Sequence, residues 1–173
     1  MDPVARSEQG AFHGQWNLAE VGRFLWDGKP IALETVEAVL LASERSFAQA
    51  GYGLWSVRLD SPSALTDPVG FCGLRVPEGR PDPEILYALD PSVWGRGYAI
   101  EAASAVLRYA FESLTLARIT AGTNPGNAAS WRVLERVGLR RTGLVHTEIE
   151  DLYTYEVTRE EFLATRLRPK DPA

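Results

Sequence analysis

Residues 94–101 read Trp94-Gly95-Arg96-Gly97-Tyr98-Ala99-Ile100-Glu101, and this stretch decides the fold prediction. It lies between a strand-like run at 84–89 and a long helical pattern that begins at Tyr98. Glycine adopts backbone angles that other residues resist and lets a backbone approach a ligand closely. The first N–H groups of a helix lack intrahelical partners and lie at the positive end of its dipole. A glycine turn that leads into a helix can therefore bind a phosphate or diphosphate, and an ordinary tight turn is the alternative.

Two common phosphate-binding motifs do not fit this stretch. The dinucleotide pattern Gly-x-Gly-x-x-Gly is incomplete because position 100 is isoleucine, and no Gly-Lys-Ser/Thr follows as in a P-loop. The phosphate prediction therefore depends on the strand, the glycines and the helix together.

Composition indicates an ordinary globular domain. The chain has 173 residues, 45% hydrophobic and 24% charged, without an apolar run of membrane-spanning length or a signal-peptide pattern. The net charge of −5 and the lack of a basic run argue against nucleic acid and membrane partners and slightly favour a cationic partner such as an amine. A single cysteine, Cys72, and two distant histidines, His13 and His146, predict no disulfide and no metal site. We expect a cytoplasmic protein.

Hydrophobic periodicity predicts a mixed α/β (α+β) fold. The expected helices are 17–25, 33–50, 98–114, 127–137 and 159–167, and the expected strands are 54–59, 69–76, 84–89, 117–123, 139–149 and 152–158. Asn127 is a suitable N-cap for the fourth helix. The short loops between the first strands, among them a hairpin loop at 60–68, favour antiparallel pairing, whereas a helix between the third and fourth strands favours parallel pairing. The sheet is therefore expected to be mixed and mostly antiparallel, with helices on both faces.

The first 16 residues show no clear period. They form either a disordered lead or an incomplete first strand and helix, and the sequence leaves both open. We expect residues 17–173 to form a single domain.

Three segments in this order resemble the GNAT superfamily of acetyl-CoA-dependent N-acetyltransferases, most closely the branch with ribosomal-protein N-terminal acetyltransferases. They are residues 84–91, 94–102 and 124–139, and the resemblance extends over roughly 17–162. It implies a GNAT-like fold and transfer of the acetyl group from acetyl-CoA to a primary amine by direct attack in a ternary complex. The acceptor is a protein N-terminus or a small-molecule amine. The family usually begins with a strand and a helix, so here the first edge strand is missing, donated by a partner in a homodimer, or replaced.

The resemblance also implies the cofactor contacts. The family's diphosphate loop reads Gln/Arg-x-x-Gly-x-Gly/Ala; Gly97 and Ala99 match it, whereas Trp94 replaces the polar first residue. The backbone of the strand at 85–89 would pair with the pantetheine arm, Asn127 matches a residue that hydrogen-bonds the arm, and capping is its alternative role. The implied cofactor-binding residues are Tyr87, Ala88, Leu89, Trp94, Gly95, Arg96, Gly97, Tyr98, Ala99, Asn127 and Ser130.

Glu84 is the first candidate for the catalytic base, acting through a water, and a surface glutamate is the alternative reading. Glu148, Glu150 and Asp151 are the other acids considered.

The family's usual tyrosine acid is replaced by Glu135, so Ser130 is the candidate proton donor to the thiolate. Tyr153 and Tyr155 either reach the substrate or belong to the core, and Cys72 has no evident base partner. The alternative function is a non-catalytic CoA-binding module with a regulatory or interaction role.

Overall fold

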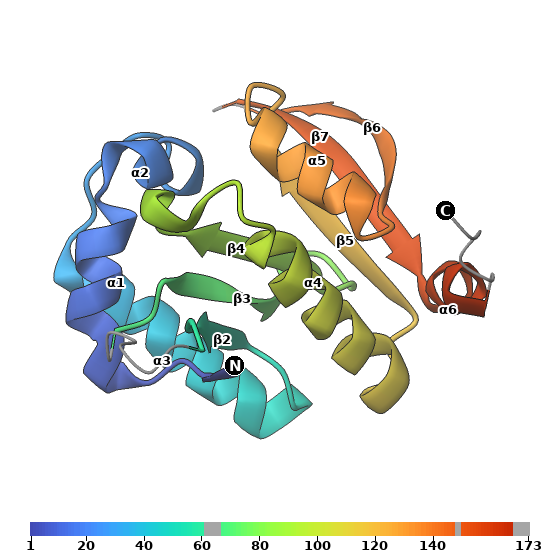
Figure 1. The fold of residues 1–173 in the computed structure, drawn as a ribbon, viewed down its shortest axis with the longest axis horizontal. Coiled ribbons are helices and arrows are strands. Elements are labelled where there is room, and N and C mark those ends of the chain that lie inside the picture. The colour runs from blue at the N-terminus through green and yellow to red at the C-terminus, as the bar shows by residue number, and fades with distance from the viewer. Residues whose placement is uncertain (61–66, 148–149, 168–173) are drawn as a thin grey trace. The chain divides into compact units, whose positions relative to one another are not determined.

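The computed structural model describes residues 1–60, 67–147 and 150–167 (Figure 1). The chain groups into two compact units. The first unit comprises Met1–Arg75 and Ile85–Ala103, and the second comprises Val76–Glu84 and Ser104–Ala173. Strand β4 (Glu84–Leu89) and helix α4 (Tyr98–Arg108) each continue from one unit into the other. The expected loop at 60–68 falls largely outside the described residues.

The strands of the first unit are hydrogen-bonded in the order β1-β2-β3-β4. The first three are β1 (Asp2–Pro3), β2 (Leu54–Val57) and β3 (Gly70–Arg75). The β1–β2 and β2–β3 pairings are antiparallel, with Trp55 opposite both Pro3 and Cys72. Beside β4 the backbones come so close that a Cβ atom at Gly70 would lie 2.3 Å from the carbonyl oxygen of Ala88. Only glycine fits at that position.

Helix α3 (Leu33–Ala50) has the predicted bounds and buries one stripe of side chains, Val36, Leu40 and Ser43. It ends at Gly51, whose φ of 76° places it in the left-handed conformation that commonly closes helices. The shorter α2 (Ala19–Leu25) lies within the predicted helix 17–25.

The N-terminal residues belong to the first unit and form a short strand and a helix, which is the second of the two readings that the sequence left open. They form β1, a 3-10 turn η1 (Arg6–Glu8) and helix α1 (Gln9–Trp16), which lies along α3 (Figure 1). Phe12 and Trp16 of α1 are fully buried, with ring centroids 6.3 and 5.3 Å from Phe71 of β3. The sequence shows no apolar helical period here because the buried residues of α1 are two aromatic side chains one turn apart and the polar Gln15.

A buried carboxylate joins this N-terminal segment to β2. The Glu8 side chain accepts the Ser56 hydroxyl at 2.9 and 2.8 Å and the backbone N–H of Ala5 at 2.6 Å. It also forms an ion pair with Arg58. Ser56 is fully buried, so its hydroxyl depends on this partner.

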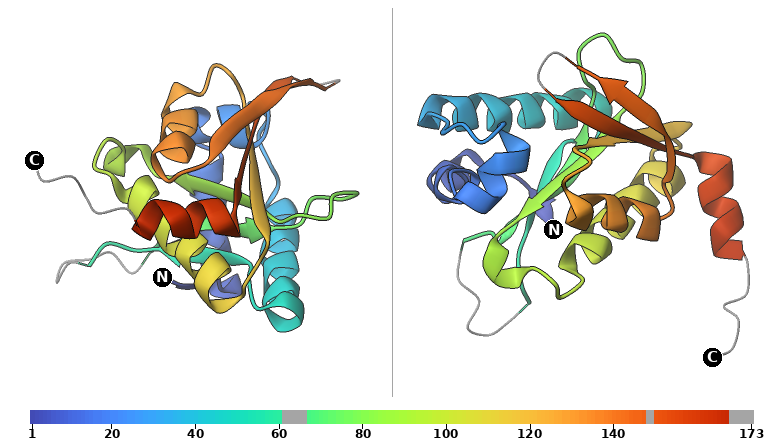
Figure 2. Two further views of the ribbon diagram at one scale, coloured as in Figure 1. Left: turned by 90° about the vertical axis from the view of Figure 1, so that its right-hand side faces the viewer. Right: turned by 90° about the horizontal axis from the view of Figure 1, so that it is seen from above.

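The second unit contains β5 (Arg118–Thr123), β6 (Arg140–His146) and β7 (Asp151–Thr158) in the hydrogen-bonded order β5-β7-β6. Both pairings are antiparallel, and Figure 2 shows β5 and β7 side by side in two views. The first residue of β4, Glu84, pairs in parallel with Thr120 of β5. Helices α5 (Ala128–Arg136) and α6 (Arg159–Leu167) complete the unit.

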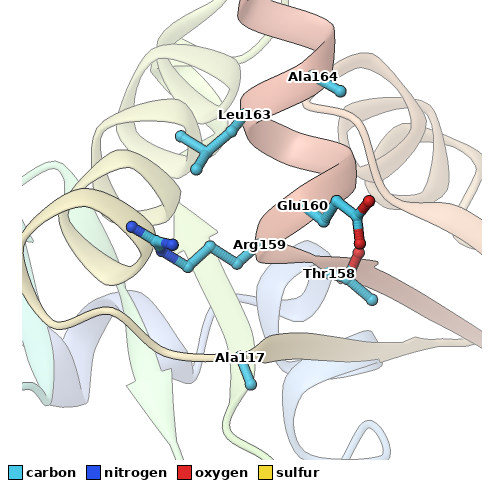
Figure 3. A pocket seen from close by; sticks show the side chains of 6 residues that line it. All are labelled: Ala117, Thr158, Arg159, Glu160, Leu163 and Ala164. Atoms are coloured by element: carbon cyan, nitrogen blue, oxygen red, sulfur yellow. The ribbon is translucent and has the colours of Figure 1, made fainter.

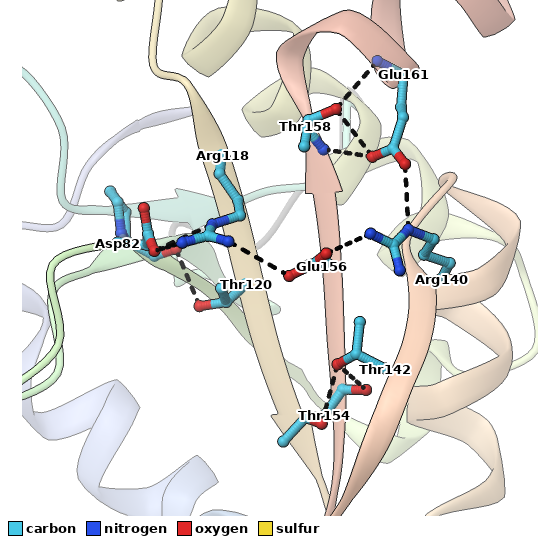
Figure 4. A network of polar contacts seen from close by, with 10 residues as sticks. Asp82, Arg118, Thr120, Arg140, Thr142, Thr154, Glu156, Thr158 and Glu161 are labelled. Carbon is cyan, nitrogen blue, oxygen red and sulfur yellow. Dashed lines mark hydrogen bonds and ion pairs between the residues drawn. The ribbon is translucent and has the colours of Figure 1, made fainter.

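Opposite charges alternate across these strands (Figure 4). Arg118 contacts Asp82 at 2.6 Å and Glu156 at 3.7 Å, and Arg140 contacts both Glu156 and Glu161. The arginines are about half exposed, so water screens these pairs and each contributes little to stability.

The predicted helix 98–114 is confirmed, but only its first part is an α-helix. Helix α4 ends at Arg108 and continues as a π-helical turn, η3 (Tyr109–Ser113). The N–H of Leu114 donates to the carbonyl of Tyr109 at 3.1 Å, a spacing of five residues. The next residue, Thr115, has a φ of 54° and ends the helix.

The predicted mixed α/β fold is confirmed. Antiparallel pairing dominates and the predicted parallel pairing occurs between Glu84 and Thr120. Across residues 1–60, 67–147 and 150–167, no helix is long and apolar enough to cross a membrane.

Candidate functional site

The glycine loop has the backbone conformation that its sequence suggests. Gly95 and Gly97 have φ values of 73° and 85°, which side chains with a Cβ rarely adopt. A Cβ atom at either position would have no heavy atom within 4 Å, so the demand for glycine is conformational rather than steric. This loop is open on the side where its glycines would bear side chains.

Helix α4 starts directly after this loop. The carbonyl of Gly97 accepts the N–H of Glu101 at 3.0 Å. The N–H groups of Tyr98, Ala99 and Ile100 precede this bond and therefore have no partner inside the helix. Together with the helix dipole, they favour an anion at this end. Arg96 is exposed within the loop and adds a positive charge.

The carboxyl end of β4 leads into the loop through a short 3-10 turn, η2 (Pro91–Val93). Tyr87 and Ala88 are half-buried and Leu89 is buried. The indole Nε1–H of Trp94 donates to the carbonyl of Leu89 at 2.7 Å. The Leu89 carbonyl is therefore already engaged, which the sequence did not predict.

Glu84 lies at the other end of β4 and belongs to the second unit. Its side chain is half-buried, and its backbone is opposite Thr120. The preceding carbonyl, of Pro83, accepts the N–H of Thr120 at 2.9 Å. Glu84 thus has a fixed backbone, as a positioned base requires.

Asn127 is the N-cap of α5, as predicted. Its side-chain oxygen accepts the N–H of Ser130 at 3.1 Å, and its carbonyl accepts the N–H of Trp131 at 3.2 Å. Ser130 is half-buried in the first turn of this helix. The structure therefore brings Asn127 and Ser130 into direct contact.

A cluster that sequence reasoning missed surrounds Glu135. Its carboxylate accepts the Tyr155 hydroxyl at 3.3 Å and lies 3.5 Å from the guanidinium of Arg141. Arg141 also donates to the Tyr155 hydroxyl at 3.0 Å and stacks 3.8 Å from the centre of the Tyr153 ring. Burial raises the pKa of Tyr155, and the hydrogen bond from Arg141 opposes that shift. Tyr155 is a core residue, because it is fully buried.

The alternative acids are tied to other groups. Glu150 accepts the Asn124 amide at 2.6 Å, and Asp151 lies 2.6 Å from the His146 ring. Glu148 lies outside the described residues. Cys72 is fully buried and burial raises the pKa of its thiol, so it is a poor nucleophile.

A surface hollow at the start of α6 is separate from these residues (Figure 3). It is lined by Ala117, Thr158, Arg159, Glu160, Leu163 and Ala164. None of them is a predicted site residue.

The family comparison identifies the domain. The sequence profile of the acetyltransferase (GNAT) domain matches residues 1–140. The uncharacterized N-acetyltransferase YnaD of Bacillus subtilis is 38% identical over 85 residues, which cover 46% of this chain and 50% of that protein. A transacetylase of Aspergillus fumigatus, named for FsC and acetyl coenzyme A, is 35% identical over 88 residues, covering 46% of this chain and 37% of that protein. The chain thus spans about half the length or less of these two curated relatives.

Solved structures agree over a longer stretch. An acetyltransferase from Agrobacterium tumefaciens has a TM-score of 0.76 and 26% identity, covering 90% of this chain and 88% of the other. Aminoglycoside acetyltransferase AAC(6')-Ib with coenzyme A and kanamycin has a TM-score of 0.74 at 19% identity, covering 94% and 96%. That second likeness shows the fold alone. Since the profile covers 140 of 173 residues, this chain belongs to the acetyltransferase (GNAT) domain family.

Proposed function

We propose that this protein is an N-acetyltransferase that transfers the acetyl group of acetyl-CoA to a primary amine in a ternary complex. One observation carries the proposal: two glycines with positive φ present an open loop directly before the N-terminus of α4. This is the backbone that a diphosphate requires, in a chain of the matching family.

Residues 95–99 would hold the diphosphate through backbone N–H groups. The backbone of Tyr87 and Ala88 would pair with the pantetheine arm as an added strand. Asn127 and Ser130 are assigned to the arm by the resemblance, and the observed cap leaves the Asn127 amide nitrogen to donate. These assignments are supported by sequence position in the family and by the backbone geometry of each segment.

The reaction needs a neutral amine, since an ammonium ion (with a pKa of about 10 for a lysine-like amine) is not a nucleophile. We assign proton removal to Glu84, acting through a water molecule. Its half-buried position on a strand supports this role, and Glu150 and Asp151 are the alternatives. Backbone N–H groups at residues 87–89 are the proposed oxyanion donors.

Ser130 is the proposed partner of the departing thiolate. The C–N bond forms as the C–S bond breaks, and the hydroxyl would stabilise or protonate the sulfur. Glu135, at the family's tyrosine position, is bound to Arg141 and Tyr155 and so does not take that role.

The acceptor is proposed to be a protein N-terminus or a small-molecule amine. The sequence resemblance to the ribosomal-protein branch favours the first. A solved structure of similar fold with kanamycin bound supports the second, and the net charge of −5 suits either cation.

Thiol release tests the proposal. The protein is incubated with acetyl-CoA and a panel of peptides with free N-termini, aminoglycosides and polyamines, and free CoA is measured with a thiol reagent. Release that depends on one amine supports the enzyme. Tight CoA binding without release across the panel would instead indicate the non-catalytic CoA-binding module.

A further inference from the structure

Trp94 makes a backbone hydrogen bond although 47% of the residue is exposed. Its indole Nε1–H donates to the carbonyl of Leu89 at 2.7 Å, five residues earlier. Water could satisfy an exposed donor, so this bond restricts the indole to one orientation at a cost in side-chain entropy. The bond also holds the Leu89 carbonyl in place.

The peptide unit between Leu89 and Asp90 is held at both ends. Trp94 binds its carbonyl, and its N–H, on Asp90, donates to the carbonyl of Val69 at 2.8 Å. The adjacent Gly70 packs so closely that a Cβ atom there would lie 2.7 Å from the Cα of Leu89. The peptide plane therefore cannot rotate without breaking one of two hydrogen bonds.

Trp94 is also fixed from the other side. Its own backbone N–H donates to the carbonyl of Pro91 at 3.1 Å, and Asp90 caps this turn by accepting the N–H of Ser92 at 2.9 Å. The next residue begins a segment with glycines at 95 and 97, which are intrinsically flexible. Helix α4 anchors the carboxyl side of this segment, and Trp94 anchors the amino side.

We propose that Trp94 is a positioning residue that sets the spacing between the end of β4 and the diphosphate loop, a role that rests on the proposed binding of acetyl-CoA. A cofactor with a diphosphate and an extended amide arm touches both places at once. Fixing their spacing makes the second contact effectively intramolecular, which raises affinity without adding a contact. The indole thus acts through the Leu89 carbonyl.

The test compares Trp94→Phe with Trp26→Phe. Both remove an indole N–H and keep an aromatic ring, but Trp26 Nε1 is buried and has no hydrogen-bond partner among the described residues. Calorimetric titration with CoA should show about three- to tenfold weaker binding for Trp94→Phe, the effect of one hydrogen bond, and a change within about twofold for Trp26→Phe. Unchanged affinity in Trp94→Phe overturns the proposal.

Two fragments separate spacing from direct contact. ADP carries the diphosphate without the arm, and pantetheine carries the arm without the diphosphate. NMR titrations measure the affinity of wild type and Trp94→Phe for ADP and for pantetheine. The substitution should weaken the binding of each fragment less than it weakens the binding of CoA. An equal loss for ADP and CoA would place the effect in the loop alone and overturn the spacing role.

A ligand-free measurement distinguishes this inference from the proposed function. Hydrogen exchange of the Asp90 amide should be about three- to tenfold faster in Trp94→Phe than in wild type or Trp26→Phe. Equal protection of the Asp90 amide in wild type and Trp94→Phe would show that the Trp94 hydrogen bond does not hold the Leu89–Asp90 peptide unit. That result would overturn the proposal even if CoA binds. Conversely, Trp94 could protect the Asp90 amide in a wild-type protein that does not bind CoA. That result would overturn the proposed function and, with it, the positioning role.

Discussion

At the scale of single residues, Gly97 has a positive φ and belongs to the proposed diphosphate loop. It can be compared with Gly79, which has a similar φ of 72° and equally open space around a Cβ atom. Glutamate at either position incurs about 1–2 kcal/mol of backbone strain. Only Gly97→Glu adds a negative charge at the proposed diphosphate site. We expect it to weaken CoA binding more than about 100-fold, and Gly79→Glu to leave it unchanged.

Calorimetry measures the affinity and urea unfolding measures the strain in both variants. Equal CoA affinity in the two variants, with equal losses of stability, would remove the loop as the cofactor site.

Glu84 is the second residue whose role can be isolated. Glu84→Gln keeps the size of the side chain and removes the proposed base, so kcat should fall about 100-fold with little change in the KM for acetyl-CoA. The pH–rate profile of the variant should therefore differ from that of the wild type. Glu78→Gln, an exposed position in the loop before β4, serves as control and should match wild type. A wild-type pH–rate profile in Glu84→Gln would exclude the base role.

At the scale of elements, Asn127 has two proposed roles, because it caps α5 and is assigned to hydrogen-bond the pantetheine arm. Asn127→Ala should destabilise the protein by about 1 kcal/mol because the Ser130 N–H loses its acceptor. Asn127→Ser keeps a capping oxygen and should preserve stability to within about 0.5 kcal/mol. We expect both variants to bind CoA more weakly, since serine does not supply the amide donor. Wild-type affinity in Asn127→Ser would leave Asn127 as a cap only.

Helix α6 begins with a reciprocal capping box that responds to pH. The Glu161 carboxylate accepts the N–H and hydroxyl of Thr158 at 2.8 and 2.9 Å, and the Thr158 hydroxyl accepts the Glu161 N–H at 3.2 Å. The Thr158 backbone bond, then its hydroxyl, then Arg140 lower the pKa of Glu161.

The pKa of Glu161 is lower in the folded protein than in the unfolded chain. The capping box therefore stabilises the fold at pH values above the unfolded-state pKa, and this stabilisation is lost as the pH falls through the folded-state pKa. Glu161→Ala should therefore reduce the urea midpoint at pH about 7 and have a smaller effect near pH 3. Glu160→Ala, at the exposed neighbouring position, is the control. An equal effect of Glu161→Ala at both pH values would contradict the linkage.

Elements with strong local signals could be predicted from the sequence. The bounds of α3, β4 and α6 match because each has a clear period or ends at a glycine or a change of period. The glycine loop was predictable for the same reason. The Glu135 cluster was not, because it depends on cross-strand register, which shifts at a bulge between Arg141 and Gly143. Tyr155 lies 14 residues from Arg141, and no local pattern connects them.

At the scale of the whole molecule, each of the two units carries its own candidate residues. The first carries the glycine loop, Trp94 and most of β4, whereas the second carries Glu84, Asn127 and Ser130. The chain passes between units inside β4 and inside α4, so both elements that adjoin the loop are shared. The loop's geometry therefore depends on the integrity of the first unit, including its N-terminal segment.

Glu8 tests how much that segment contributes. Glu8→Ala would leave Arg58, the Ser56 hydroxyl and the Ala5 N–H without their shared acceptor, and the Ser56 hydroxyl is fully buried. The expected loss is about 2–4 kcal/mol in the free energy of unfolding. Glu44→Ala removes an exposed ion pair with Arg6, whose side chains are 59% and 60% exposed, and should cost no more than about 0.5 kcal/mol.

Urea denaturation of both variants, followed by near-ultraviolet circular dichroism of the buried aromatic residues, measures the difference. A similar small loss for Glu8→Ala and Glu44→Ala would mean that the buried carboxylate does not hold the N-terminal segment in place. In that case the pairing of β1 with β2 and the core contacts of Phe12 and Trp16 would anchor β1 and α1 to the unit that presents the loop.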